Sequence, residues 1–189
     1  MEFIKGSGLK GKELKKNKEL EEAVAAILED VRSRGDEAVR EYTRRFDGGE
    51  ALFYKIPEEE INRARSQLPR KTLASLRFAA EQIEFFARSQ LACISPLECE
   101  RLPGVTLGHR IIPVASCGAY VPGGRYPLPS SALMSVIPAR VAGVRRVVAC
   151  SPPVKGKGTI HPAVLAALRL AGADEIYCMG GAQAVAAMA

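Results

Sequence analysis

Two glycine-containing loops hold the residues in this chain that are best suited to chemistry. The first is Gly118–Gly124, with the sequence GAYVPGG. Paired glycines let the backbone approach a ligand closely and expose its amide groups. Within this loop Tyr120 offers a flat ring and a hydroxyl group that suit a planar base or a sugar. The alternative is a tight connection between two elements with a half-buried tyrosine.

The second loop is Gly180–Ala184, with the sequence GGAQA. Glycines before a helix N-terminus form a natural phosphate site, because free amides and the helix dipole point outward. Gln183 falls in the first helical turn, where its amide can both donate and accept hydrogen bonds. Neither loop has the G-x-G-x-x-G spacing of the usual dinucleotide fingerprint. Spacing alone therefore indicates a nucleotide site only weakly.

The thiols and imidazoles do not form a metal-binding pattern. The chain has five cysteines, at positions 93, 99, 117, 150 and 178, and no C-x-x-C pair. Its only histidines are His109 and His161. This spacing excludes a zinc ribbon or finger. We expect both histidines to be non-catalytic. We also expect the thiols to be reduced, because an odd number of cysteines without a secretion signal is typical of cytosolic proteins.

The elements that position the two loops are predicted as alternating strands and helices over residues 111–189. Strands are expected within 111–121, 147–150 and 175–179. Helices are expected from Pro129-Ser130-Ser131 with a serine cap, over 161–171 with Gly172 at its end, and from about Ala182. This order predicts a parallel, Rossmann-like sheet. Both loops then fall at the carboxyl ends of strands, where such sheets bind ligands.

The front half of the chain is predicted to be helical. Helices are expected over 18–34, 36–46, after Pro57 and over 71–90. Apolar residues at helical spacing, such as Leu20 to Val31 and Leu73 to Ile83, predict core-facing stripes. Strand segments are expected within 97–114, around a turn at Pro103-Gly104. The fold class is thus α/β, with a helical N-terminal region (1–96) followed by a Rossmann-like region (97–189).

The sheet of that second region is expected to be incomplete. A final helix of about two turns is marginal by itself, and so few strands leave sheet faces uncovered. Val185 and Met188 need partners. We expect a truncated sequence or one half of a split protein; the alternative is a short homologue that closes its open side by dimerising.

The bulk composition indicates a soluble globular protein, with 47% hydrophobic and 25% charged residues in 189. No stretch reaches the roughly 18 apolar residues of a membrane span, and the first 20 residues lack the apolar core of a signal peptide. We expect a cytoplasmic protein without a membrane partner. The net charge is +6, with lysines at 10, 12, 15, 16 and 18. Acidic residues follow at once and no aromatic residue interleaves, so a solvated helix start is favoured over a nucleic-acid-binding arm.

Longer strings resemble the histidinol dehydrogenase family. The matching segments in the second half are Gly118–Gly124, Pro129–Met134, Ile137–Val144 and Gly180–Ala184, in the family's order. Asp30–Arg32, Gly35–Ala38 and Phe46–Gly48 match more loosely, so the resemblance covers nearly the whole chain after about residue 18.

The resemblance implies an enzyme that oxidises an amino alcohol to an amino acid in two NAD-dependent steps. It implies that Tyr120 and Gln183 contact NAD and that the protein is a homodimer whose partner completes each site. The family's zinc ligands, its Glu–His catalytic pair and an asparagine contact to NAD correspond to positions beyond Ala189. We therefore expect no catalytic or metal-binding residue within this chain.

Two alternatives stay open beside an N-terminal part of histidinol dehydrogenase. The same family could act on another polar alcohol, such as a sulfonated diol, or the chain could be a non-catalytic NAD- or partner-binding half-protein. Zinc binding separates the enzymes from the half-protein. A thiohemiacetal between an aldehyde intermediate and Cys117 or Cys150 is also conceivable. Cys150 ends an apolar strand, which favours an inert thiol.

Overall fold

The computed structural model describes residues 18–47, 54–123 and 126–189. A four-stranded sheet forms its centre, in the order β1-β6-β5-β4. Strands β4 (Ser116–Tyr120), β5 (Arg146–Ser151) and β6 (Glu175–Cys178) are parallel. These three strands confirm the predicted sheet, although β4 is shorter than the apolar run that suggested it. The short edge strand β1 (Tyr54–Lys55) pairs antiparallel with β6 and was not predicted.

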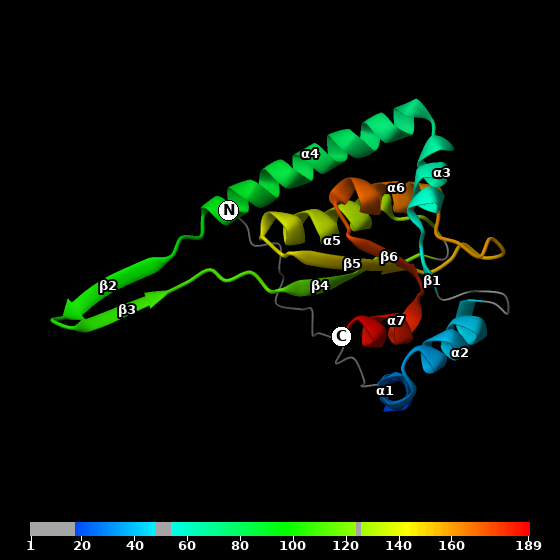
Figure 1. Ribbon diagram of the computed structural model, residues 1–189, viewed down its shortest axis with the longest axis horizontal. Helices are drawn as coiled ribbons and strands as arrows, with labels where there is room; N and C mark the ends of the chain where they lie inside the picture. The colour runs from blue at the N-terminus through cyan, green and yellow to red at the C-terminus, as the bar shows by residue number, and fades with distance from the viewer. Residues whose placement is uncertain (1–17, 48–53, 124–125) are drawn as a thin grey trace, which may run out of the picture.

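Helices cover both faces of the sheet (Figure 1). One face carries α5 (Pro129–Val141) and α6 (Pro162–Ala171), with α3 (Glu58–Ser66) and α4 (Arg70–Ala92) packed on them. The opposite face carries α7 (Gly181–Met188), against which α1 (Lys18–Arg34) and α2 (Asp36–Asp47) pack. The crossover helices thus change face after β6. In open α/β sheets such a change marks the region where ligands bind, at the carboxyl ends of the strands.

The main core lies between the sheet and the α5–α6 layer. Its fully buried members include Leu133, Val147, Leu165 and Ile176. Ile61 of α3 and Leu76 of α4 belong to the same cluster, and Leu73, Ala80 and Ile83 pack against it, which confirms the core-facing stripe predicted for α4. A second cluster joins α1, α2 and α7 to the other face.

The core-facing stripe predicted for α1 is confirmed at Val31 and Ile27, which belong to or pack on the second cluster, and is wrong at Leu20 and Leu28. Val31 is buried, whereas Leu20 and Leu28 are 60% and 43% exposed. The reason is that, among the elements described, α1 packs chiefly on α7 and α2 at one end of the molecule. The lysine-rich segment before Lys18 lies outside the described residues.

A β-hairpin projects from the body of the molecule (Figure 1). It consists of β2 (Leu97–Leu102) and β3 (Val105–His109), joined through the predicted turn at Pro103-Gly104. All side chains of both strands are exposed.

Helix α5 begins at Pro129, with Leu128 as its N-cap and no side-chain cap hydrogen bond. The predicted serine cap is therefore wrong. Proline at the first helical position has the right φ and lacks an N–H that would need a partner, so the helix starts before the serines. Ser131 lies inside the helix, where its carbonyl accepts a hydrogen bond from the Ser135 hydroxyl.

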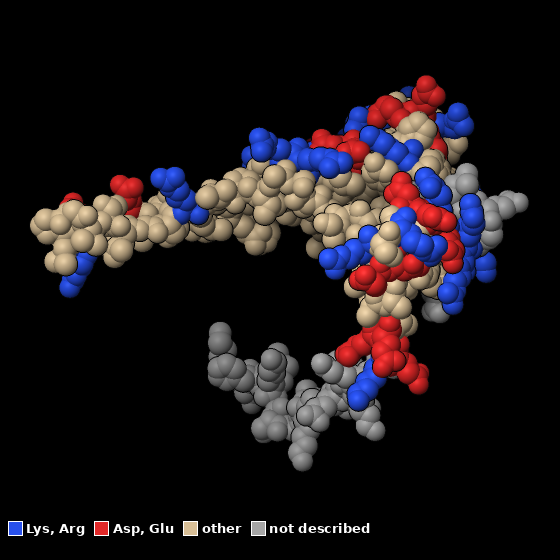
Figure 2. Space-filling view, turned by 60° about the horizontal axis from the view of Figure 1, so that its bottom comes forward, with Lys and Arg blue, Asp and Glu red and all other residues tan. Residues whose placement is uncertain are grey.

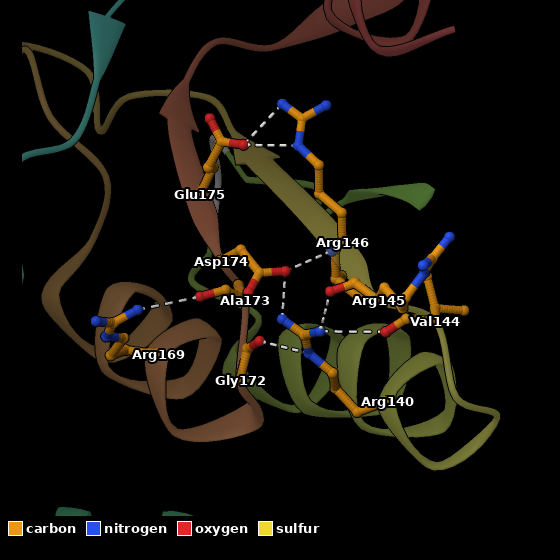
Figure 3. A network of polar contacts seen from close by, with 10 residues as sticks. Arg140, Val144, Arg145, Arg146, Arg169, Gly172, Ala173, Asp174 and Glu175 are labelled. Carbon is orange, nitrogen blue, oxygen red and sulfur yellow. Dashed lines mark hydrogen bonds and ion pairs between the residues drawn. The ribbon is translucent and has the colours of Figure 1, made fainter. Parts of the chain in front are cut away.

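Charged residues tie the helices to the amino ends of β5 and β6 (Figure 3). Arg140 donates to the carbonyl oxygens of Gly172 and Val144 and forms an ion pair with Asp174. Arg146 and Lys55 pair with Glu175 at 2.7 and 3.1 Å. These groups satisfy one another, and they lie at the edge of the sheet opposite the two glycine-containing loops. We assign them a structural role.

Candidate nucleotide site

The carboxyl ends of the three parallel strands form one edge, and both predicted loops lie on it. The Val121 amide donates to the Cys150 carbonyl at 2.8 Å, and the Met179 amide donates to the Ser151 carbonyl at 3.0 Å. Pro152 fills the space between the loops, since a Cβ on Gly123 or Gly180 would lie 2.9 or 2.6 Å from its side chain. The glycines therefore let the two loops close around Pro152. Gly124 lies outside the described residues.

Tyr120 connects the two loops. It is the last residue of β4, and its hydroxyl accepts a hydrogen bond of 3.4 Å from the Gly181 amide at the start of α7. This distance is near the upper limit for a hydrogen bond, so the amide remains available to a stronger acceptor. The Tyr120 ring is half-buried and packs against the cluster that contains Cys150 and Ala184.

Gln183 is buried without the partners that a buried amide normally has. Its side chain is completely buried, and neither its amide nitrogen nor its amide oxygen has a hydrogen-bond partner among the described residues. A neighbouring glycine makes room for it: Gly181 has φ +69°, and a Cβ there would collide with the Gln183 amide. Because buried polar groups are almost always paired in folded proteins, this amide is a candidate contact for a bound ligand.

Two residues of α2 also have buried polar atoms without a hydrogen-bond partner, and the sequence did not point to either of them. Thr43 is completely buried, and its hydroxyl oxygen has no partner in the described part of the chain. The same holds for one carboxylate oxygen of the half-buried Asp47, and burial raises the pKa of this carboxyl group. The one available signal was the Phe46–Gly48 match, which indicated no role.

The histidines have local structural roles. His161 is the N-cap of α6, where its ring nitrogen Nδ1 accepts from the Ala163 amide at 3.2 Å. His109 lies on the hairpin, with Nε2 2.8 Å from the Ser95 carbonyl oxygen. Over residues 18–47, 54–123 and 126–189, no three His, Cys, Asp or Glu side chains come together as a metal site. None of the helices described is long and apolar enough to span a membrane.

The cysteines lie in very different surroundings. Burial raises the pKa of the Cys150 thiol to about 12. Burial, with smaller contributions from the charges of Asp47 and Glu60, raises that of Cys178 to about 12 as well. Both thiols are therefore protonated at neutral pH and are poor nucleophiles. Cys117 is half-buried.

The fold and this edge define the class: an α/β protein whose parallel sheet presents glycine-containing loops and a helix N-terminus at the edge where such sheets bind ligands. Comparison with known proteins gives the family. The family model described as histidinol dehydrogenase matches residues 10–189, so the chain belongs to the histidinol dehydrogenase family.

Individual relatives agree with this assignment. Histidinol dehydrogenase of Methanosarcina mazei is 48% identical over 89% of this chain and 38% of the relative. Sulfopropanediol 3-dehydrogenase of Ruegeria pomeroyi is 41% identical over 100% of this chain and 42% of the relative. The crystal structure of histidinol dehydrogenase from Elizabethkingia anophelis superposes with a TM-score of 0.80 at 34% identity, over 89% of this chain and 38% of that one. The chain thus spans about two-fifths of the length of these relatives.

Proposed function

We propose that this chain forms the NAD-binding part of a zinc-dependent histidinol dehydrogenase, which oxidises L-histidinol to L-histidine. The observation that carries the proposal is the unpartnered, fully buried Gln183 amide beside Tyr120 at the start of α7. When bound, NAD supplies the hydride acceptor. Gln183 and Tyr120 hold the cofactor and move no proton, so they act by positioning it.

The residues fit such a cofactor. The Gln183 amide has a free donor and a free acceptor, which suits the carboxamide or the ribose hydroxyls of a dinucleotide. The exposed backbone amide of Gly181, at a helix N-terminus, suits its diphosphate. Zinc does not fit the described residues, which contain no cluster of ligands. Its ligands and the proton-transferring Glu–His pair are expected outside these 189 residues, so we derive no step through zinc.

The test is Gln183→Leu in the full-length product of the gene. Leucine fills a similar volume but offers no hydrogen bond, so NADH binding measured by fluorescence should weaken about tenfold, the effect of losing one good hydrogen bond to a ligand. Bound zinc, measured by elemental analysis, should be unchanged. Val185→Ala, on the exposed side of the same helix, is the control and should leave both unchanged. Unaltered NADH affinity in Gln183→Leu would remove Gln183 from the site.

A second substrate has specific support. The relative from Ruegeria pomeroyi, named sulfopropanediol 3-dehydrogenase, matches the whole of this chain. A sulfonated diol is therefore the alternative to histidinol, and the same NAD site would serve both. Comparing turnover of the two alcohols by one purified enzyme distinguishes them. A non-catalytic half-protein predicts NAD binding with turnover of neither.

We also propose a homodimer, because a large apolar surface faces solvent on one side of the molecule. Phe78 and Phe85 of α4 are 65% and 73% exposed and lie seven residues apart, on one helix face. The hairpin adds exposed Leu102, Val105 and Leu107. Figure 2 shows that most of the surface of the projecting hairpin is uncharged. Such surfaces mark protein–protein contacts.

A further inference from the structure

One face of α2 points towards the nucleotide site. Val39, Thr43 and Asp47 follow one another at four-residue spacing, which places them on the same side of the helix. Val39 is completely buried in the cluster that also contains Cys150, Met179 and Ala184. This face is therefore turned towards the ends of β5 and β6 and the first turn of α7. In Figure 1, α2 lies beside α7 on the same face of the sheet.

The side chains on this face change from apolar to polar along the helix. Val39 makes ordinary core contacts, Thr43 places an unpartnered hydroxyl one turn further on, and Asp47 places an unpartnered carboxylate oxygen at the end. Asp47 is the last residue of α2, and this helix packs on α7, whose first turn holds Gln183. Met179 and Gly180 follow Cys178 directly and lead into the turn that holds Gln183.

The unpartnered groups of α2 and α7 therefore border the same edge of the sheet. An unpartnered buried hydroxyl or carboxylate costs stability, and a fold that only had to pack would place apolar side chains here. A carboxylate accepts hydrogen bonds, and a hydroxyl both donates and accepts them. The complementary ligand group is one that offers several O–H donors close together. In a dinucleotide that group is the ribose diol, which acidic side chains of other Rossmann-like proteins also bind.

We propose that Thr43 and Asp47 form a second wall of the nucleotide site and accept hydrogen bonds from ribose hydroxyl groups of the bound dinucleotide. The proposal rests on the function proposed above, since it adds residues to the same site. It makes α2 a binding element in addition to a packing element. Replacing either side chain should therefore weaken ligand binding more than it destabilises the fold.

The test uses two nearly isosteric variants, Thr43→Val and Asp47→Asn, in the full-length gene product. The probe is ADP-ribose, which carries both ribose rings without nicotinamide. Each variant should bind it about tenfold more weakly by calorimetry, the effect of losing a hydrogen bond to the ligand. In the absence of ligand, the melting temperature of each variant should be equal to or above that of the parent, because Thr43→Val removes an unpaired buried hydroxyl group and Asp47→Asn removes a partly buried negative charge. Asp36→Asn, at the exposed start of α2, and Thr106→Val, on the hairpin, are the controls.

The outcomes separate this inference from the proposed function. Unchanged ADP-ribose affinity in both variants, with Gln183→Leu still weakening NADH binding, would overturn the second wall and leave the cofactor site in place. Weaker binding that accompanies a lower melting temperature would also overturn it, because the residues would then act through the fold. A parent protein that binds neither ADP-ribose nor NADH would overturn the proposed function itself.

Discussion

At the scale of single residues, the surroundings of the five thiols predict a graded reactivity. Cys93 and Cys99 are exposed, Cys117 is half-buried, and Cys150 and Cys178 are buried with pKa values of about 12. Thiolate is the reactive form, so we expect two fast-reacting thiols and one slower thiol in the native chain at pH 8. The two buried thiols should react only after denaturation. A chromogenic disulfide reagent followed over time checks this.

The control for the thiol experiment is the double variant Cys93→Ser and Cys99→Ser, which should lose the fast phase. Mass spectrometry that found Cys150 or Cys178 labelled in the fast phase would contradict the assignment. It would also reopen the hypothesis that Cys150 attacks an aldehyde. The structure gives that thiol no basic neighbour among the described residues and no exposure.

The sequence predicted the candidate site only in part. Tyr120 and Gln183 could be named because their loops resemble the family's, and the structure brings both loops to one edge of the sheet. Their contact with NAD stays a prediction. Thr43 and Asp47 could not be found in this way, because an unpartnered buried group is a property of tertiary packing. Along the sequence, both look like ordinary polar positions of an amphipathic helix.

At the scale of elements, the charge cluster around Glu175 predicts a pH-dependent contribution to stability. Hydrogen bonds from Arg146, Lys55 and Tyr177 lower the pKa of this carboxyl group to about 2 against the opposing effect of burial. A lowered carboxyl pKa means that the folded state favours the charged form. The stabilisation is present above the ordinary pKa of 4.5 and is lost as the pH falls towards 2.

Glu175→Gln should therefore lower the free energy of unfolding at pH 7 and make little difference near pH 2. Arg146 and Lys55 are largely exposed, so we expect a modest loss of about 1 kcal/mol at pH 7. Urea unfolding at a series of pH values measures it. Glu98→Gln on the exposed hairpin is the control and should show no comparable loss. A difference that persists unchanged at pH 2 would mean that packing, not charge, explains the effect.

Elements were predicted well where local chemistry determines them. The helices α1 to α4 and the end of α6 at Gly172, with φ +94°, fall close to where periodicity and glycine placed them. The prediction failed where an element forms only because it pairs with a segment far away in the sequence. Strand β1 has only two residues and exists because Tyr54 pairs with Cys178, more than a hundred positions away. The boundary proposed near residue 97 stays a prediction.

At the scale of the whole molecule, the exposed apolar side chains of α4 and of the β2–β3 hairpin predict how copies of the chain associate. The projecting hairpin and the outer face of α4 expose aliphatic and aromatic side chains, which a monomer would leave in water. Burial of such surface is the main favourable term in association. Charge introduced at the centre of the surface should therefore oppose the dimer, because it would be buried without a partner.

Phe85→Glu in the full-length gene product should convert the proposed dimer to a monomer, with the mass in solution measured by light scattering after size-exclusion chromatography. Leu20→Glu is the matched control: it also places a charge at an exposed apolar position, but on α1, on the opposite face of the sheet. This control should keep the mass of the parent. We expect both variants to fold, because Phe85 is 73% exposed and contributes little to the core. Circular dichroism checks this. A parent that is monomeric, or a Phe85→Glu variant with unchanged mass, would place the interface elsewhere.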